Sequence, residues 1–262
     1  MKYYNIFEKV KKDNDKARKD LHPNFIITWG QAGAGKTELI KNVKNDFKNE
    51  EFVIIDADEY RKFHPNIKRF KENSLTAVIQ TNEFVCELER ELILYYMKKK
   101  YNVIFMTSSK DYKEITDLID LLVFRNYKVC IYGIVTSFRE GFISAQERYE
   151  RQLQDENEFP RYVSFKFYIK SYKGTRDTLK KLIGDDRVSN IKLFKRTTEK
   201  IPVNLYNGNK LSDYDKVIKI LKVQELITDN YEGRINELYD IKRARDAHKL
   251  EYKDLDKFLG EN

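Results

Sequence analysis

Eight residues near the start of the chain combine small side chains, a lysine and a hydroxyl group in a pattern suited to binding phosphate. They occupy positions 30–37 and read G-Q-A-G-A-G-K-T. Small residues let backbone N–H groups approach phosphate oxygens and form a concave nest for them. The following lysine is expected to reach the β- and γ-phosphates, and the threonine hydroxyl is expected to bind Mg²⁺. The expected nucleotide-binding residues are Gly30, Gln31, Ala32, Gly33, Ala34, Gly35, Lys36 and Thr37, with Thr37 also the expected metal ligand.

Two carboxylates follow the next apolar run, residues 52–55. They are Asp56 and Asp58, and strand alternation puts both on the same side of the chain. In an open α/β sheet, ligands bind beyond the carboxyl ends of the strands, so a carboxylate here is placed to take a proton from an attacking hydroxyl. Two other roles stay open: holding Mg²⁺ through water, or, for Asp58, capping the next helix. The residues alone do not decide which aspartate is the base.

The elements that must position these residues follow from hydrophobic periodicity. Apolar runs at 25–29, 52–55, 103–106 and 128–135 have the length of buried strands, and 189–194 and 202–206 are expected to form a late strand pair. Helical spacing is found at 39–47, 75–100, 111–125, 138–153 and 161–183. Strands that alternate with helices and are apolar throughout predict an α/β fold with a parallel sheet of about five strands. The glycine-rich stretch then lies between a strand and a helix, as a phosphate loop requires.

Both ends of the chain are expected to be helical. Residues 1–19 read as an amphipathic helix with Ile6, Val10 and Ala17 facing inward, ended by a His-Pro pair at 22–23. A turn signal at 207–209 precedes a charged segment with helical spacing. We expect a main domain over residues 1–205 and a helical extension over 206–262 packed on it.

Composition limits the class of protein. The 262 residues carry 50 Lys and Arg against 42 Asp and Glu, a net charge of +8, which suggests an acidic partner. The lysines are spread along the chain and form no basic stripe with aromatics, so nucleic acid is not the expected partner. Two cysteines exclude a disulfide framework. The first twenty residues hold no apolar core of a signal peptide, and no apolar run reaches membrane-spanning length, so the expected location is the cytoplasm.

Taken in order, these motifs resemble the zeta toxin family of kinases. That family follows a G-Q-x-G-x-G-K-[ST] loop with D-x-D, a basic residue and His-Pro, and then with two arginines thirteen residues apart. The matching residues here are Asp56, Asp58, Arg61, His64 and Pro65, then Arg148 in Arg-Tyr-Glu, and Arg161. The resemblance covers roughly residues 20–195.

The resemblance implies a P-loop kinase fold and an ATP- and Mg²⁺-dependent phosphoryl transfer. Lys36 would bind the ATP phosphates, Asp58 would be the general base, and Arg148 and Arg161 would neutralise the phosphoryl group in transit. Planar guanidinium groups suit that last role because they match spread phosphate charge. Family substrates are nucleotide-activated amino sugars, typically UDP-N-acetylglucosamine phosphorylated at the 3′-hydroxyl. Family partners are antitoxin proteins that block the ATP site.

One departure from the family concerns the acceptor pocket. Family members carry Ile-Glu-Gly-Thr after the third strand, whereas Met106 stands here where the glutamate is expected. Methionine cannot accept a hydrogen bond as a carboxylate does. The residues left as possible substrate contacts are Asp56, Arg61, His64, Thr107, Ser108 and Lys110. A polynucleotide or RNA kinase, and a nucleotide-binding regulator that has lost its acceptor site, are the alternative functions.

Overall fold

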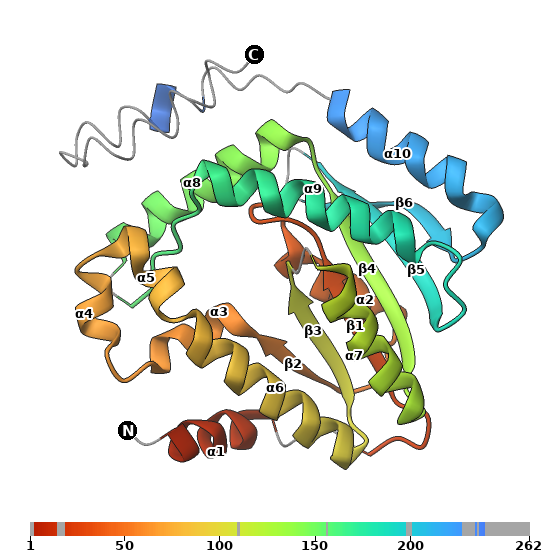
Figure 1. The fold of residues 1–262 in the computed structure, drawn as a ribbon, viewed down its shortest axis with the longest axis horizontal. Helices are drawn as coiled ribbons and strands as arrows, with labels where there is room; N and C mark the ends of the chain where they lie inside the picture. Colours follow the sequence, from red (N-terminus) through yellow and green to blue (C-terminus); the bar gives the residue numbers. More distant parts are fainter. Residues whose placement is uncertain are drawn as a thin grey trace.

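A six-stranded sheet in the order β2-β3-β1-β4-β5-β6 forms the centre of the protein (Figure 1). The structure is a computed structural model and describes residues 3–14, 19–108, 111–155, 157–197, 201–226, 234 and 236–238. The strands are β1 (Asn24–Trp29), β2 (Phe52–Asp56), β3 (Asn102–Thr107), β4 (Lys128–Val135), β5 (Val188–Arg196) and β6 (Pro202–Gly208). Strands β1 to β5 pair in parallel, and β6 pairs antiparallel with β5. The predicted α/β fold is confirmed, and the late strand pair expected at 189–194 and 202–206 is present as β5 and the antiparallel edge strand β6.

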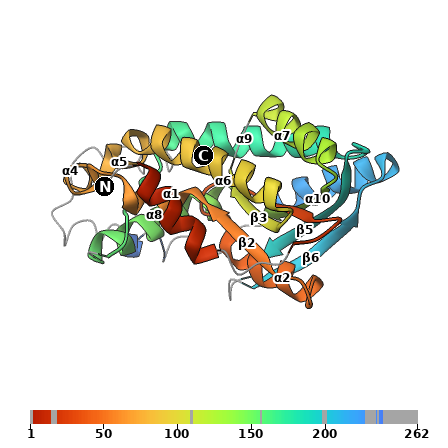
Figure 2. The same cartoon turned by 90° about the horizontal axis from the view of Figure 1, so that it is seen from below.

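Helices cover both faces of the sheet (Figure 2). One face packs against α6, α7 and α9, and the other against α2. Every residue of the central strand β1 is buried because helices lie on both sides of it. The helices are α1 (Tyr3–Asn14), α2 (Leu39–Asp46), α3 (Ala57–Tyr60), α4 (Ile67–Lys71), α5 (Ser74–Gln80), α6 (Asn82–Lys99), α7 (Tyr112–Phe124), α8 (Phe138–Gln154), α9 (Phe165–Leu182) and α10 (Tyr214–Leu226).

Strand order brings the expected site residues to one edge. Because β1 lies between β3 and β4, and all are parallel with β2, the carboxyl ends of these four strands meet at the same edge of the sheet. Asp56 at the end of β2 is in register with Met106 of β3, which is in register with Thr28 of β1. This edge is where an open parallel sheet binds ligands.

The N-terminal helix packs on the main core as its periodicity predicts. Ile6 and Val10 of α1 are buried, at 0% and 3% exposure, and the ring of Phe7 meets that of Tyr95 in α6 with centroids 5.9 Å apart. Ala17, the third residue expected to face inward, lies outside the described residues.

The helix after the sheet also belongs to this core. Val217 and Leu221 of α10 are 0% and 2% exposed, and they belong to the apolar cluster on the face of the sheet covered by α6, α7 and α9. Arg176 of α9 donates from Nη1 to the carbonyl oxygen of Leu221 at 3.2 Å, which fixes α10 along α9. Of the helical extension predicted over 206–262, the part described beyond α10 is residues 234 and 236–238.

None of the helices among the described residues is long and apolar enough to cross a membrane.

Truncation of Leu221 tests whether α10 is integral to the domain. Leu221→Ala is expected to lower the free energy of unfolding by about 2–5 kcal/mol, because a buried leucine leaves a cavity when shortened. The measurement is urea unfolding followed by circular dichroism. Val223→Ala is the control, since Val223 on the same helix is 45% exposed. Equal unfolding curves for the two variants would show that α10 contributes nothing to the core.

Candidate active site

The loop after β1 packs directly on α8. Gly33 has φ +74°, and a Cβ atom there would stand 1.9 Å from the carbonyl oxygen of Gly141 in α8. No side chain fits at this contact, so glycine is required both by the backbone angle and by the space. Gln31 fixes the base of the loop, because its side-chain amide donates to Thr136 Oγ1 at 2.7 Å in a buried bond. The nest predicted from the spacing of residues 30–37 therefore rests on α8, more than 100 residues further along the chain.

Lys36 points back into this loop. Its ammonium donates to the carbonyl oxygens of Gly30 and Gln31 at 2.8 and 3.2 Å. Burial lowers the pKa of Lys36 to about 8, against the attraction of Asp58. Both acceptors are neutral carbonyls, so the charge is hydrogen-bonded without being neutralised by them. Thr37 beside it is exposed to solvent.

Asp56 is the residue that caps the helix. It precedes α3, and its Oδ1 accepts from the backbone N–H of Asp58 at 3.0 Å. The capping role considered for Asp58 is therefore wrong for that residue and belongs to Asp56, because α3 begins one residue after β2 ends. Burial and the charge of Asp58 raise the pKa of Asp56 to about 6.

Asp58 is held by two arginines from different parts of the chain. Arg61 donates from Nε to Oδ1 at 3.1 Å, and Arg161 donates from Nη1 to Oδ2 at 2.5 Å. Burial alone would raise the pKa of Asp58, but Arg161 and then Arg61 hold it well below its usual range. Asp58 is thus ionised at neutral pH, and both of its oxygens are already engaged.

Arg148 brings a second buried guanidinium to the site. Burial and then the charge of Arg161 lower the pKa of Arg148 to about 10, so it stays cationic at neutral pH. Its Nε is buried and has no hydrogen-bond partner among the described residues. A buried donor without an acceptor is costly, and an anionic oxygen in this space would satisfy it.

The charges of Lys36, Arg148 and Arg161 act on one another and on Asp56 and Asp58. The structure therefore brings together the residues expected to bind phosphate and the residues expected to transfer it.

Other expected contacts are engaged within the protein. Arg61 is 6% exposed and donates to Thr81 Oγ1 at 2.8 Å, so it orients Asp58. His64 lies between the rings of Phe70 and Phe84, with centroids 4.8 and 5.0 Å away.

The end of β3 holds the remaining expected contacts. Met106 is 8% exposed beside Asp56, where the family glutamate was expected. Thr107 is half-buried and Ser108 is exposed just beyond it. Lys110 lies outside the described residues.

Glu89 of α6 joins the site without having been predicted. Burial, then the charges of Asp56 and Asp58, raise its pKa to about 8. The sequence does hold a signal for it: Glu89 falls at helical spacing between Val85, Leu92 and Tyr96, which are all buried. A carboxylate inside an apolar stripe is the feature that would have identified it, whereas the neighbouring Glu87 and Arg90 are exposed.

A model of the zeta toxin family matches residues 8–214 of the chain. Among solved structures, the chain is similar to one from the PezAT chromosomal toxin–antitoxin system of the human pathogen Streptococcus pneumoniae. The likeness has a TM-score of 0.71 at 19% identity and covers 90% of this chain and 96% of that one.

A second similar structure is the AvrRxo1-ORF1:-ORF2 complex with ATP, with a TM-score of 0.57 at 11% identity. It covers 91% of this chain and 79% of that one. At these identities the likenesses show a shared fold. The comparison with curated proteins gives no match.

The pKa of Glu89 makes a pH-dependent stability prediction. In the folded state the Glu89 carboxyl group binds its proton more tightly than in the unfolded state, where glutamate has its ordinary pKa of about 4.5. The stability that this proton binding contributes is therefore fully present below about pH 4.5 and is lost as the pH rises through about 8. Glu89→Gln should therefore melt at a higher temperature than the wild type at pH 8.5 and differ little from it at pH 5, in thermal unfolding scans across that range. Glu87→Gln, at an exposed position of the same helix, is the control. A difference between Glu89→Gln and wild type that does not change with pH would contradict the assignment.

Proposed function

The chain belongs to the zeta toxin family, and from this premise we propose that it is an ATP-dependent kinase, the toxin of a toxin–antitoxin pair, which phosphorylates a hydroxyl group of a nucleotide sugar. The observation that carries the proposal is the convergence of Lys36, Asp58, Arg148 and Arg161, whose charges shift one another's pKa values beside the glycine-rich loop. A protein that only bound nucleotide would need neither a base nor two arginines at the transferring group.

The residues present suit a nucleoside triphosphate. The unpartnered Nε of Arg148 is placed for an anionic oxygen, and the ammonium of Lys36 has two carbonyl bonds that a phosphate would replace with charge-assisted ones. Thr37, exposed at the start of the helix, would hold Mg²⁺, which when bound neutralises charge on the β- and γ-phosphates. ATP is the donor supported by the family.

Asp58 would act as the general base once the acceptor is bound. The acceptor hydroxyl gives its proton to Asp58 while its oxygen forms a bond to the γ-phosphorus, and the bond from that phosphorus to the β-phosphate oxygen breaks to release ADP. In the resting protein Arg161 occupies Oδ2 of Asp58. The γ-phosphate would compete for this guanidinium while the acceptor hydroxyl takes its place at Oδ2, so the carboxylate oxygen that the proton needs would become free only when both donor and acceptor are bound.

Glu89 would provide the acceptor contact that Met106 lacks. Its carboxyl group lies on α6, close enough to Asp56 and Asp58 for their charges to raise its pKa. At a pKa of about 8 it is protonated at neutral pH, so it can donate as well as accept a hydrogen bond to a sugar hydroxyl. The resemblance favours UDP-N-acetylglucosamine as the acceptor and an antitoxin protein as the partner.

An ATP-consumption assay over a panel of acceptors tests the proposal. The panel holds UDP-N-acetylglucosamine, other nucleotide sugars, free amino sugars and oligonucleotides, and mass spectrometry identifies the phosphorylated product. Transfer to a nucleotide sugar supports the proposal. Transfer to oligonucleotides would identify a polynucleotide kinase instead, and ATP binding without transfer to any acceptor would indicate a regulator.

Replacement of the base should separate binding from chemistry. Asp58→Asn is expected to lower kcat by about 10²–10⁴-fold, because the proton then has no carboxylate to accept it. Binding of a non-hydrolysable ATP analogue should persist, as measured by calorimetry. Glu59→Gln, which removes an exposed carboxylate one residue away, is the control. Retention of wild-type turnover in Asp58→Asn would remove Asp58 from the mechanism.

Loss of the arginine partner should shift the pH profile. In Arg161→Ala the pKa of Asp58 rises toward the ordinary aspartate value of about 3.9, because the largest attraction that depresses it is gone. Since the base works only when ionised, the acid limb of kcat/KM should move to higher pH, together with a fall in kcat. Arg161→Lys keeps a charge and should show a smaller shift. An acid limb that stays in place would mean that Arg161 does not act on the base.

A further inference from the structure

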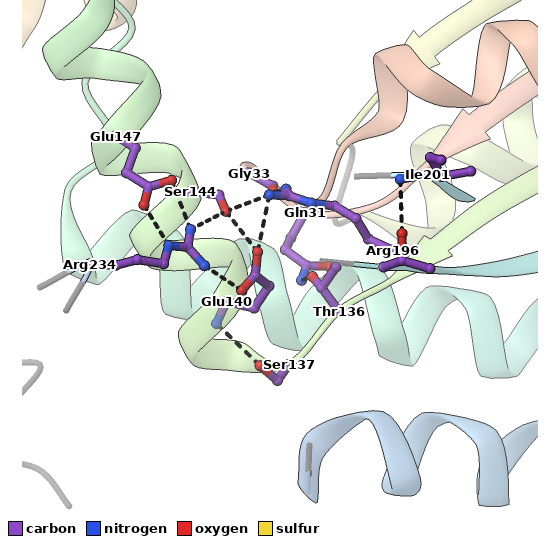
Figure 3. Close-up of polar contacts among 11 residues, drawn as sticks. Gln31, Gly33, Thr136, Ser137, Glu140, Ser144, Glu147, Arg196, Ile201 and Arg234 are labelled. Atoms are coloured by element: carbon purple, nitrogen blue, oxygen red, sulfur yellow. Dashed lines mark hydrogen bonds and ion pairs between the residues drawn. The ribbon is translucent and has the colours of Figure 1, made fainter. Parts of the chain in front are cut away.

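A four-residue ionic network joins the C-terminal part of the described chain to the phosphate loop (Figure 3). Its first member, Arg234, lies 94 residues beyond Glu140 in α8, yet donates from Nη1 to Glu140 Oε2 at 2.7 Å. Arg234 also donates two hydrogen bonds to the carboxylate of Glu147 in α8, from Nε to Oε1 at 2.6 Å and from Nη2 to Oε2 at 2.8 Å. Such paired bonds fix the direction of a guanidinium as well as its position.

The other oxygen of Glu140 holds an arginine from the sheet. Arg196, the last residue of β5, has its Nη2 3.1 Å from Glu140 Oε1, and its side chain is 9% exposed. From Nη1 the same guanidinium donates to the carbonyl oxygen of Gly33 at 3.1 Å. Glu140 therefore lies between Arg234 and Arg196, and Arg196 touches the middle of the phosphate loop.

A hydroxyl group ties the network together. Ser144 Oγ accepts from both arginines, at 3.2 Å from Arg196 and 3.1 Å from Arg234, and donates to Glu140 Oε1 at 3.0 Å. With two cations and two carboxylates the cluster is neutral, so loss of either arginine leaves an uncompensated, largely buried carboxylate. The members depend on one another for this reason.

An apolar contact anchors the same segment one helical turn later. Leu238 is 1% exposed and packs in a cluster with Phe142 and Ile143 of α8. Ala32 of the phosphate loop packs against the same cluster. We call residues 234 and 236–238 the strap. The strap is bound to α8, the helix on which the loop rests, through the ion pairs of Arg234 and the apolar packing of Leu238.

We propose that the strap positions the phosphate loop for ATP, acting through Glu140 and Arg196 on the carbonyl oxygen of Gly33. Because the peptide unit is planar, holding this oxygen also fixes the direction of the N–H group of Ala34 inside the loop. The strap is then a positioning element for the nucleotide and part of the working enzyme. The inference rests on the proposed binding of ATP.

Calorimetric titration of the full-length protein with a non-hydrolysable ATP analogue tests this inference. Arg234→Ala should weaken binding by about fivefold or more, the lower end of the range usual for coupled sites. In kinetic assays the KM for ATP should rise while kcat at saturating ATP stays close to that of the wild type. Lys222→Ala, which removes an exposed positive charge from α10, is the control and should leave the affinity unchanged.

A double-mutant cycle distinguishes positioning from general destabilisation. If Arg234 acts through Glu140, the combined variant Glu140→Gln with Arg234→Ala should bind the analogue no more weakly than Glu140→Gln alone. Should Arg234→Ala fail to fold, Arg234→Lys replaces it, because lysine keeps the charge but cannot grip Glu147 with two parallel bonds.

Three outcomes would overturn the inference. Unchanged affinity in Arg234→Ala would show that the strap does not act on the loop, and tighter binding would make it a cover over the site. Additive losses in the cycle would remove the path through Glu140. In each case the wild type binds the analogue, so the proposed kinase function stands; a wild type that binds no ATP analogue would overturn both.

Discussion

The absence of a side chain at Gly33 sets the distance between the phosphate loop and α8. Because the Gly33 backbone lies against the Gly141 carbonyl, the first turn of α8 packs directly on the loop. Arg148 lies two turns further along this helix, and Arg161 follows shortly after its end, where it reaches Asp58. A side chain at Gly33 would separate the helix from the loop and move both arginines away from the place where phosphate is expected, and one at Gly141 would meet the hydroxyl of Tyr168 in α9. The arrangement of charge in the site depends on this one contact between backbones.

Electrostatics then give three carboxylates different states within a small volume. Asp58 is ionised because two arginines bind it, whereas burial raises the pKa values of Asp56 and Glu89. Groups whose surroundings separate their pKa values in this way are a common basis for dividing acid and base roles. The cations show the same division, since Lys36 titrates near 8 while Arg148 stays charged. The ionised carboxylate of Asp58 thus lies near Lys36 and Arg148, two cations to which a phosphate group could bind.

Sequence was sufficient where the chemistry is local. The spacing of residues 30–37 and the apolar runs beside them identify the phosphate loop, and the five parallel strands and the late edge pair follow from periodicity. The capping role of Asp56 was not visible, because it depends on α3 beginning directly after β2. Glu89 was missed although its place in an apolar stripe marks it. Arg196 and Arg234 could not be found at all, since their partners lie 52 to 163 residues away and only the tertiary fold brings them together.

The ion pair between Asp58 and Arg161 has a consequence for the time between turnovers. A kinase with ATP bound is exposed to water, which is the most abundant hydroxyl acceptor in the cell. A base whose two oxygens are both held by guanidinium groups takes no proton from a passing water molecule. In the proposed enzyme, the contact that keeps Asp58 ionised would therefore also limit idle hydrolysis of ATP, and the selectivity for a sugar hydroxyl over water would begin before the acceptor binds.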